Sequence, residues 1–437
     1  MSLYQNLFYT DFTQELCSDE RMVSLMLEAE WALVKAQEEQ GIIPKDTTTT
    51  LSGIFQTIEI DIEKLKRAIP LTGNAAAPLV KQLVAEVKKQ NEEAAKYIHL
   101  GATSQDIVDT ATILKAKHFL FWLHEKITTL EQILTQLTRQ YRNTVMMGRT
   151  LMQQARPITF GLKTAIWLEG IRSLKQQLQS AENELLCIQL GGAVGSQNQY
   201  LSQGVRHSFA QILGLRDSTN WHTQRGNLAA FASVLGVLTG NLAKIANDIV
   251  LLSQTEVGEV FEPSAEGRGT SSTMPHKRNP VLCTSILANA HRVPFGVASL
   301  LTAMPQAHER SAGRWQAEWE TLDDLLGLTA GAMEKSIELL GGLEVNEGRM
   351  RQNIELTSGL IFAETVALAL AEKEGKQAAH DLIKKACQTA TAEGKHLLEI
   401  VEQLDLGFTS KELSDFFQPE NAIGGSLDII DEILANK

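Results

Sequence analysis

The 437-residue sequence has little cysteine and few signals for β-strands. Its four cysteines, at positions 17, 187, 283 and 387, are far apart, which argues against a disulfide framework or a cysteine-based zinc site. We therefore expect small buried thiols in a protein of the reducing cytoplasm. No short alternating apolar runs joined by Asn-Gly turns are present, so the pattern does not favour a β-protein.

Positive charge is also scarce. Lys and Arg number 40 against 52 Asp and Glu, which gives a net charge of −12 and no basic run. Nucleic acids and anionic membranes attract cationic surfaces, so neither is an expected partner. The first twenty residues lack the pattern of a signal peptide, and we expect no apolar stretch of membrane-spanning length.

The ten prolines leave long spans without proline, at 79–156, 158–262 and 306–418. Proline interrupts helix interiors, so these spans can hold long helices, and their Leu, Ala, Gln, Glu and Lys content favours them. Apolar residues three and four apart predict a helix over 109–145, which would be about 55 Å long.

Further long helices are predicted after Pro157, over 226–254 and around 321–343. The 226–254 segment carries few charges, which indicates burial on most sides and favours an oligomeric bundle. The sequence therefore predicts an all-α protein. Its expected parts are an N-terminal α domain (1–110), a central long-helix bundle (111–353) and a C-terminal α domain (354–437).

The first polar interruption is residues 97–111, YIHLGATSQDIVDTA. Gly101 permits a sharp turn, and Thr103 or Ser104 can cap the helix that follows. A capped helix start is the simpler interpretation. The alternative is an anion site made of backbone N–H groups and two hydroxyls, with His99 as an acid, base or hydrogen-bond donor.

Two further polar segments have plain interpretations as well. Residues 147–161 carry Gln153 and contain Pro157, which we interpret as a helix start, so the segment is a helix–helix connection. Residues 304–322 carry Arg310 and Arg314 and have the pattern of an amphipathic helix face. The alternative is that these arginines bind a multiply charged anion.

The most unusual segment is residues 267–280, GRGTSSTMPHKRNP. Two glycines loosen it, and Asn279 with Pro280 predicts the N-cap and first residue of a helix. Partial positive charge gathers at a helix N-terminus, and Lys277 adds a full charge. A serine in that field would have its pKa lowered and its alkoxide favoured, so we interpret this loop as functional.

These segments resemble the fumarase/aspartase superfamily. TSSTMPHKRNP matches that family's signature, Ser-Ser-x-Met-Pro-x-Lys-x-Asn-Pro, and we call residues 267–280 the signature loop. HLGATSQDIVDTA and GRTLMQQARP are similar to two further regions of the family, and SQTEVGEVFEP resembles the lead-in to the loop. The similarity spans essentially the whole chain.

The resemblance implies a homotetramer on a twenty-helix core, with each active site built from three subunits and no metal or organic cofactor. It implies that Ser271 transfers a proton at a carbon next to a carboxylate. Lys277 and Asn279 would bind a carboxylate and stabilise the aci-carboxylate intermediate. Further implied contacts at the substrate are Thr103, Ser104, Gln153, Met274 and, orienting a carboxylate, His99.

One position departs from the family pattern. Fumarases and adenylosuccinate lyases have Thr-His-x-Gln where this chain has Thr150-Leu151-Met152-Gln153. That histidine serves the leaving group, and leucine cannot. A carboxylate, with a pKa of about 4, leaves or attacks without a proton partner. Leu151 therefore favours a lactone-forming cycloisomerase, in which a substrate carboxylate adds to a double bond of its own molecule.

The expected substrate is a small tricarboxylate. On an acidic protein it requires a local cationic pocket, and ordering of residues 265–277 over it would exclude water. The candidate cations are Lys277, Arg225, Arg310 and Arg314.

Two alternatives stay open. One is an adenylosuccinate-type lyase, disfavoured by Leu151 and by the absence of Arg and His from 71–83, the region that binds the nucleotide phosphate in those enzymes. The other is a non-catalytic structural homologue, which the intact signature loop disfavours.

Overall fold

The computed structural model describes residues 3–436, which divide into two compact units. Unit 1 comprises Met1–Ile127, Leu174–Leu242 and Ser285–Glu334, and unit 2 comprises Thr128–Ser173, Ala243–Thr284 and Lys335–Lys437. The three-domain division made from the sequence stays a prediction.

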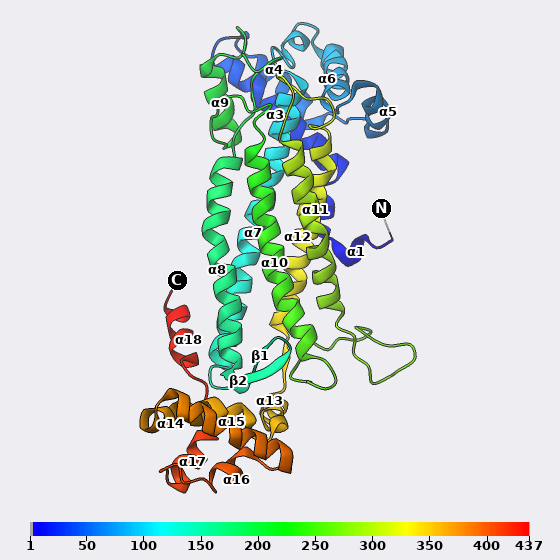
Figure 1. The fold of residues 1–437 in the computed structure, drawn as a ribbon. Coiled ribbons are helices and arrows are strands. Elements are labelled where there is room, and N and C mark those ends of the chain that lie inside the picture. Colours follow the sequence, from blue (N-terminus) through cyan, green and yellow to red (C-terminus); the bar gives the residue numbers. More distant parts are fainter. Residues whose placement is uncertain (1–2, 437) are drawn as a thin grey trace. The chain divides into compact units, whose positions relative to one another are not determined.

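Five long helices dominate the chain (Figure 1), and each contributes residues to both units. They are α7 (Ser104–Gln140), α8 (Phe160–Leu185), α10 (Gly226–Leu252), α11 (Val281–Ala303) and α12 (Ala317–Gly341). The predicted all-α class is confirmed, and each predicted long helix is present. The first of them is shorter than expected at its end, because the chain leaves the helix at Gln140.

Helix α10 shows how the sequence selects a buried helix. Phe231, Leu235, Leu238 and Leu242 recur three and four residues apart and are all buried. By length and composition α10 could cross a membrane, so the expectation of no such stretch was wrong. Half of its most apolar window is buried within the protein, as in the core helix of a globular protein.

Unit 1 also contains helices before α7 and one helix between α8 and α10. An apolar core that includes Val34, Leu51, Leu83 and Ile98 lies among the helices of residues 19–97. The helices are α1 (Gln5–Phe8), α2 (Asp11–Leu16), α3 (Asp19–Glu39), α4 (Thr47–Thr57), α5 (Ile62–Thr72), α6 (Ala76–Gln90), the 3-10 helix η1 (Ala94–Tyr97) and α9 (Gln203–Leu213).

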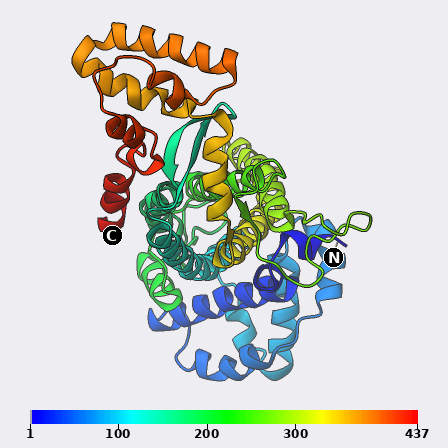
Figure 2. The ribbon, with the colours of Figure 1, turned by 90° about the horizontal axis from the view of Figure 1, so that it is seen from below.

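Unit 2 ends in a helical region with its own apolar core, which includes Phe362, Leu370, Ile383 and Val401. Helices α14 and α15 lie side by side in it (Figure 2). The helices are α13 (Glu347–Ile354), α14 (Ala363–Glu374), α15 (Lys376–Glu393), α16 (Leu397–Val401), α17 (Ser410–Phe416) and α18 (Ser426–Ala435), with 3-10 turns η2 (Glu355–Thr357), η3 (Leu360–Phe362) and η4 (Pro419–Asn421).

Unit 2 contains four strands in two antiparallel pairs. The longer pair is the hairpin of β1 (Val145–Thr150) and β2 (Gln153–Thr159); the shorter joins β3 (Val260–Phe261) to β4 (Glu344–Val345). The interpretation of Pro157 as a helix start was wrong. Pro157 lies within β2 opposite Met147, and α8 begins at Phe160.

The turn of the β1–β2 hairpin consists of Leu151 and Met152. Both have left-handed backbones, with φ of 49° and 65°, as a two-residue hairpin turn requires. Neither is the Gly or Asn that such a turn favours, so each costs about 1–2 kcal/mol. Both side chains are exposed, Leu151 by 96%. The strain indicates that this turn is held by other contacts of the hairpin.

Candidate active site

The segment around the start of α7, in unit 1, carries His99, Thr103 and Ser104 among the predicted site residues. His99 has a left-handed backbone (φ 58°), and its Nδ1 lies 2.6 Å from Oε1 of Glu30, a fully buried carboxylate of α3. Burial lowers the pKa of His99, but the charge and hydrogen bond of Glu30 and the charge of Asp106 outweigh it, so the net effect is a raised pKa. His99 is therefore held by Glu30 and biased toward the imidazolium.

Asp106 organises the start of α7. Its buried carboxylate accepts the backbone N–H groups of Gly191 (2.8 Å), Gly192 (2.9 Å) and Thr103 (3.0 Å), and lies 2.9 Å from Nε2 of His222. These contacts fix the orientation of the Asp106 carboxylate. It also occupies the amide of Thr103, so an anion here would rely on side chains rather than on that backbone group.

Arg310 contacts Thr103, another of the predicted site residues. Its Nη2 donates to Oγ1 of Thr103 at 3.0 Å and to the carbonyl of Ala193 at 3.1 Å, and its Nε donates to Oε1 of Gln105 at 2.9 Å. The arginine remains exposed to solvent. Thr103, Ser104 and Arg310 therefore offer hydroxyl and guanidinium donors at one place, which suits a carboxylate.

Arg225 was expected to be a cation available to the substrate, but it is buried and already paired. It is only 2% exposed. Its guanidinium donates to Asp109 at 2.7 and 3.1 Å and to Glu318, and it stacks on Trp221. Burial opposes its charge, but the two carboxylates outweigh this and raise its pKa. Arg225 thus lies behind the site, with its donors committed to carboxylates.

The segment that carries Arg310 and Arg314 is not the helix face expected. Residues 304–316 form turns, and α12 begins only at Ala317. His308 and Gly313 have positive φ angles of 50° and 85°, which a helix does not allow. Arg314 is exposed in the last of these turns.

The β1–β2 hairpin, in unit 2, carries another of the predicted site residues, Gln153. Arg149 makes a bidentate pair with the fully buried Glu259, at 2.9 and 2.6 Å. Asn353 donates to the same carboxylate at 2.7 Å, and Gln154 donates to the carbonyl of Asn353 at 2.9 Å. These bonds hold the hairpin while Gln153, beside the strained turn, stays exposed.

The signature loop, also in unit 2, carries Ser271, Met274, Lys277 and Asn279 among the predicted site residues. Thr270 and Arg278 form an antiparallel bridge across its neck, and both the backbone N–H and the side-chain amide of Asn279 donate to the carbonyl of Gly269, at 2.9 and 3.1 Å. Gly269 has φ 63°, and a Cβ there would lie 2.3 Å from the Asn279 carbonyl oxygen. Only glycine therefore fits at this neck.

Ser271 follows the neck directly. Its Oγ accepts the backbone N–H of Met274 at 3.0 Å and that of Thr273 at 3.4 Å. Donors directed at this oxygen would stabilise an alkoxide. Met274 and Lys277 are exposed on the same loop. The loop thus carries the Ser271 hydroxyl and the Lys277 ammonium group six positions apart in the sequence.

The predicted cap of the next helix was wrong. Helix α11 begins at Val281, and the side chain of Asn279 bonds to the loop neck instead. The backbone N–H groups of Leu282 and Cys283 donate to the buried carboxylate of Glu262, at 3.1 and 2.7 Å. Glu262 neutralises the partial charge that we expected to act on Ser271.

Glu259 and Glu262 were therefore missed, although they flank β3 in the lead-in segment GEVFEP. Their only sequence signal is that one acidic residue stands on each side of the two apolar residues of the strand.

The side chains of two arginines anchor the base of the loop. Arg268 pairs with Glu338, and Arg278 makes a bidentate pair with Glu344 at 2.9 Å for both bonds. A cavity of about 220 Å³ lies at the loop base and is lined by Asn279, Glu262 and both arginines among other residues.

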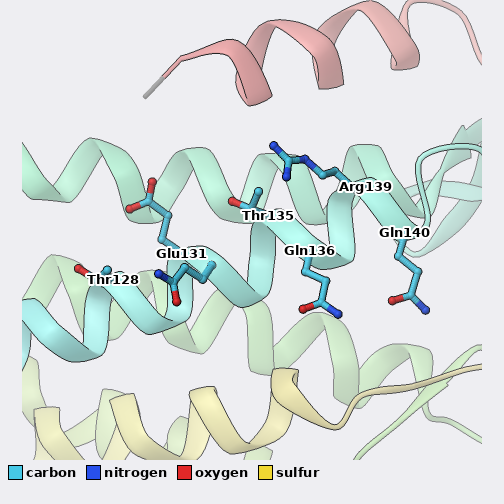
Figure 3. A pocket seen from close by; sticks show the side chains of 7 residues that line it. Thr128, Glu131, Thr135, Gln136, Arg139 and Gln140 are labelled. Carbon is cyan, nitrogen blue, oxygen red and sulfur yellow. The ribbon is translucent and has the colours of Figure 1, made fainter.

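A larger cavity of about 840 Å³ lies along α7 in unit 2 (Figure 3). All of its lining residues have polar or charged side chains, and none of them is a site residue predicted from the sequence. The lining residues are Thr128, Glu131, Gln132, Thr135, Gln136, Arg139 and Gln140.

The predicted site residues thus fall into two groups. His99, Thr103, Ser104, Arg225, Arg310 and Arg314 lie in unit 1, and Gln153, Ser271, Met274, Lys277 and Asn279 lie in unit 2. The multi-helix fold and the signature loop agree with the fumarase/aspartase-type lyase that the sequence resembles.

The comparisons with known proteins agree. Residues 5–295 match the family model described as lyase, and residues 359–433 match the adenylosuccinate lyase C-terminus. The chain belongs to this lyase family, in the fumarase/aspartase superfamily.

Individual relatives are similar along the whole chain. A protein of Acinetobacter baylyi named 3-carboxy-cis,cis-muconate cycloisomerase is 45% identical over 99% of this chain and 98% of its own. The structure of β-carboxy-cis,cis-muconate cycloisomerase from Acinetobacter calcoaceticus sp. ADP1 matches with a TM-score of 0.94 at 42% identity, covering 100% of each chain. The 3-carboxy-cis,cis-muconate lactonizing enzyme of Pseudomonas putida matches with a TM-score of 0.93 at 38% identity, over 99% of this chain and 98% of that one.

Proposed function

We propose that the protein is a cycloisomerase that converts 3-carboxy-cis,cis-muconate to 4-carboxymuconolactone, in the protocatechuate (β-ketoadipate) branch of aromatic catabolism. The observation that carries this choice within the family is Leu151. It occupies an exposed hairpin turn beside Gln153, where the resemblance places a histidine in hydratases and amine-releasing lyases. An apolar side chain there supplies no proton, and this reaction needs none at that position.

The reaction rearranges bonds without loss of atoms. A carboxylate oxygen of the substrate forms a C–O bond at one carbon of its own double bond, and the π electrons move onto the neighbouring carbon and its carboxylate as an aci-carboxylate. Lys277 stabilises the negative charge that develops there. The Ser271 hydroxyl then donates its proton to that carbon, and the Met274 and Thr273 amides stabilise the alkoxide left behind. Solvent returns the proton to Ser271.

The other carboxylates of the substrate bind to donors that the structure leaves open. Thr103, Ser104 and Arg310 form one such group, and His99, held by Glu30, orients a carboxylate next to them. Arg314 adds charge at the rim. We assign Arg225 to the support of this group rather than to the substrate, because its donors bond to Asp109 and Glu318.

We further propose that the active form is a cytoplasmic homotetramer in which segments of three subunits form each site. Both groups of predicted residues would then serve one substrate although they belong to different units. The apolar residues exposed on the long helices, Phe121, Ile166, Val237 and Phe295, support association between copies.

A direct assay tests the reaction. Purified protein is mixed with 3-carboxy-cis,cis-muconate, loss of the diene absorbance is followed, and the lactone is identified by NMR. No turnover, together with cleavage of adenylosuccinate or argininosuccinate, would refute the assignment. Inertness toward all of these and other tricarboxylates would favour the structural homologue.

Shared sites have a separate test. Arg310→Met and Ser271→Ala variants, each expected to have much lower activity than wild type, are mixed, dissociated and reassembled. Recovery of activity toward the fraction expected for random mixing supports sites built from several subunits. No recovery, with co-purification of differently tagged variants showing that mixed assemblies formed, refutes them.

A further inference from the structure

Gln105 lies between the exposed Arg310 and the buried ion pairs behind it. The residue is fully buried in the first turn of α7. Its Oε1 accepts from Nε of Arg310 at 2.9 Å, while its Nε2 donates to Oδ2 of Asp109 at 3.1 Å and to the carbonyl of His222 at 3.0 Å. One side chain therefore links a solvent-facing cation to the interior of unit 1.

The interior end of this link is rigid. Asp109 accepts two bonds from Arg225, at 2.7 and 3.1 Å, and one from the indole N–H of Trp315 at 2.9 Å. Arg225 also binds the carboxylate of Glu318. The four residues of this buried set, Asp109, Arg225, Trp315 and Glu318, are each at most 5% exposed. A buried carboxylate with several donors keeps one orientation, because each lost bond would leave a buried charge less compensated.

The amide of Gln105 can have only one orientation in these surroundings. The Asp109 carboxylate and the His222 carbonyl both accept hydrogen bonds, so both must face the NH₂ end of the amide. Its oxygen must then face Arg310, which can only donate. The buried ion pairs thereby fix the position of Gln105 Oε1, which accepts the hydrogen bond from Arg310.

We propose that Gln105 is a positioning residue that aims the guanidinium of Arg310 at a carboxylate of the substrate. With Nε held by Gln105 and Nη2 held by Thr103 and Ala193, the plane of the guanidinium is set. Its Nη1 has no protein acceptor within residues 3–436 and can donate to an incoming carboxylate. A preset plane matters because guanidinium–carboxylate bonds depend on direction as well as charge.

The inference rests on the proposed function for the identity of the substrate, and a double-mutant cycle tests it. Wild type, Gln105→Met, Arg310→Met and the double variant are compared by kcat/KM for 3-carboxy-cis,cis-muconate. Methionine keeps the approximate size of glutamine, and Asp109 keeps its bonds to Arg225 and Trp315. We expect Gln105→Met to lower kcat/KM about tenfold, mainly through KM, in the wild-type background, and less than about twofold once Arg310 is gone.

A buried glutamine of the same unit offers a matched control. Gln37 is fully buried, and its amide donates to the carbonyls of Leu100 (2.8 Å) and Tyr200 (3.1 Å), without a bond to Arg310. Gln37→Met should lower the unfolding temperature about as much as Gln105→Met does. Its effect on kcat/KM, whatever its size, should be the same with and without Arg310. A residue that merely stabilises the fold behaves like this control.

The cycle is also run on Kd for tricarballylate, a tricarboxylate with no double bond to react, so that binding is scored apart from turnover. Equal effects of Gln105→Met in both backgrounds, by either measure, would overturn the positioning role. Coupling in Kd without turnover by wild type would keep the positioning role and remove the proposed reaction. Neither turnover nor tricarballylate binding by wild type would overturn both.

Discussion

Glu262 accepts a hydrogen bond from the backbone N–H of Cys283 at 2.7 Å and so caps the helix that follows the signature loop. A capping carboxylate at a helix N-terminus contributes about 1–2 kcal/mol. We expect Glu262→Ala to lower the free energy of unfolding by about that amount, measured by chemical denaturation. Glu266→Gln, a change of an exposed acid on the same stretch, is the control and should have little effect. Equal stability of Glu262→Ala and wild type would show that the cap contributes nothing.

The two serines of the signature loop should behave differently. Ser271 accepts two backbone N–H groups at its Oγ, whereas Ser272 is exposed. Proton transfer by a positioned group is typically worth about 100-fold to 10,000-fold. Ser271→Ala should therefore lower kcat at least about 100-fold with the helical circular dichroism unchanged. Ser272→Ala should stay within about threefold of wild type. Near-normal turnover by Ser271→Ala would place the proton donor elsewhere.

The His99–Glu30 pair predicts a pH dependence of stability. The pKa of His99 is raised above its ordinary value of 6.5 in the folded protein. Folding therefore favours the protonated form, and this stabilisation is complete below pH 6.5 and disappears as the pH rises through the raised pKa. His99→Gln should destabilise the protein more at pH 6 than at pH 9 when unfolding is compared with wild type at both pH values.

A direct measurement checks the same point. The imidazole of His99 should titrate above pH 6.5 by NMR, and Glu30→Gln should lower that midpoint, because the opposing charge is removed. His380, exposed on α15, is the internal reference and should not respond to Glu30→Gln. A His99 midpoint below 6.5 would contradict the prediction.

The long helices were predictable because their determinants are local. Proline spacing and apolar residues three and four apart are enough to place α8 and α10 close to their observed limits. The hairpin was missed because Leu151 and Met152 are poor residues for a left-handed turn. Contacts far along the chain, such as that between Arg149 and Glu259, hold the hairpin instead.

In the candidate site, too, local sequence features were predictable and contacts between distant residues were not. The sequence shows that Arg225 is a cation but does not show its partners. Asp109 lies 116 positions before it and Glu318 lies 93 positions after it, so only the folded chain reveals that its charge is already compensated. The signature loop and the 97–111 segment were recognisable because their special residues are neighbours in sequence. The functions of the site residues stay predictions until the variants are assayed.

The hairpin turn allows a test in which stability and activity should move in opposite directions. Asn-Gly is the dipeptide favoured by a two-residue turn with two left-handed residues. Replacing Leu151 and Met152 with Asn and Gly should therefore raise the free energy of unfolding by about 1–2 kcal/mol. The chain nevertheless has apolar side chains there, both exposed in the monomer. We expect them to pack beside the substrate in the assembled enzyme, so the variant should lose at least about tenfold in kcat/KM.

Strain relief alone must be separated from loss of these side chains. Ser358, also in unit 2, has a left-handed backbone of φ 49° outside the predicted site, and Ser358→Gly should gain stability without a change in kcat/KM. A hairpin variant that is more stable and fully active would show that Leu151 and Met152 do not act at the substrate. In that case Leu151 would no longer distinguish the cycloisomerase from the lyases, and the assignment within the family would rest on overall similarity alone.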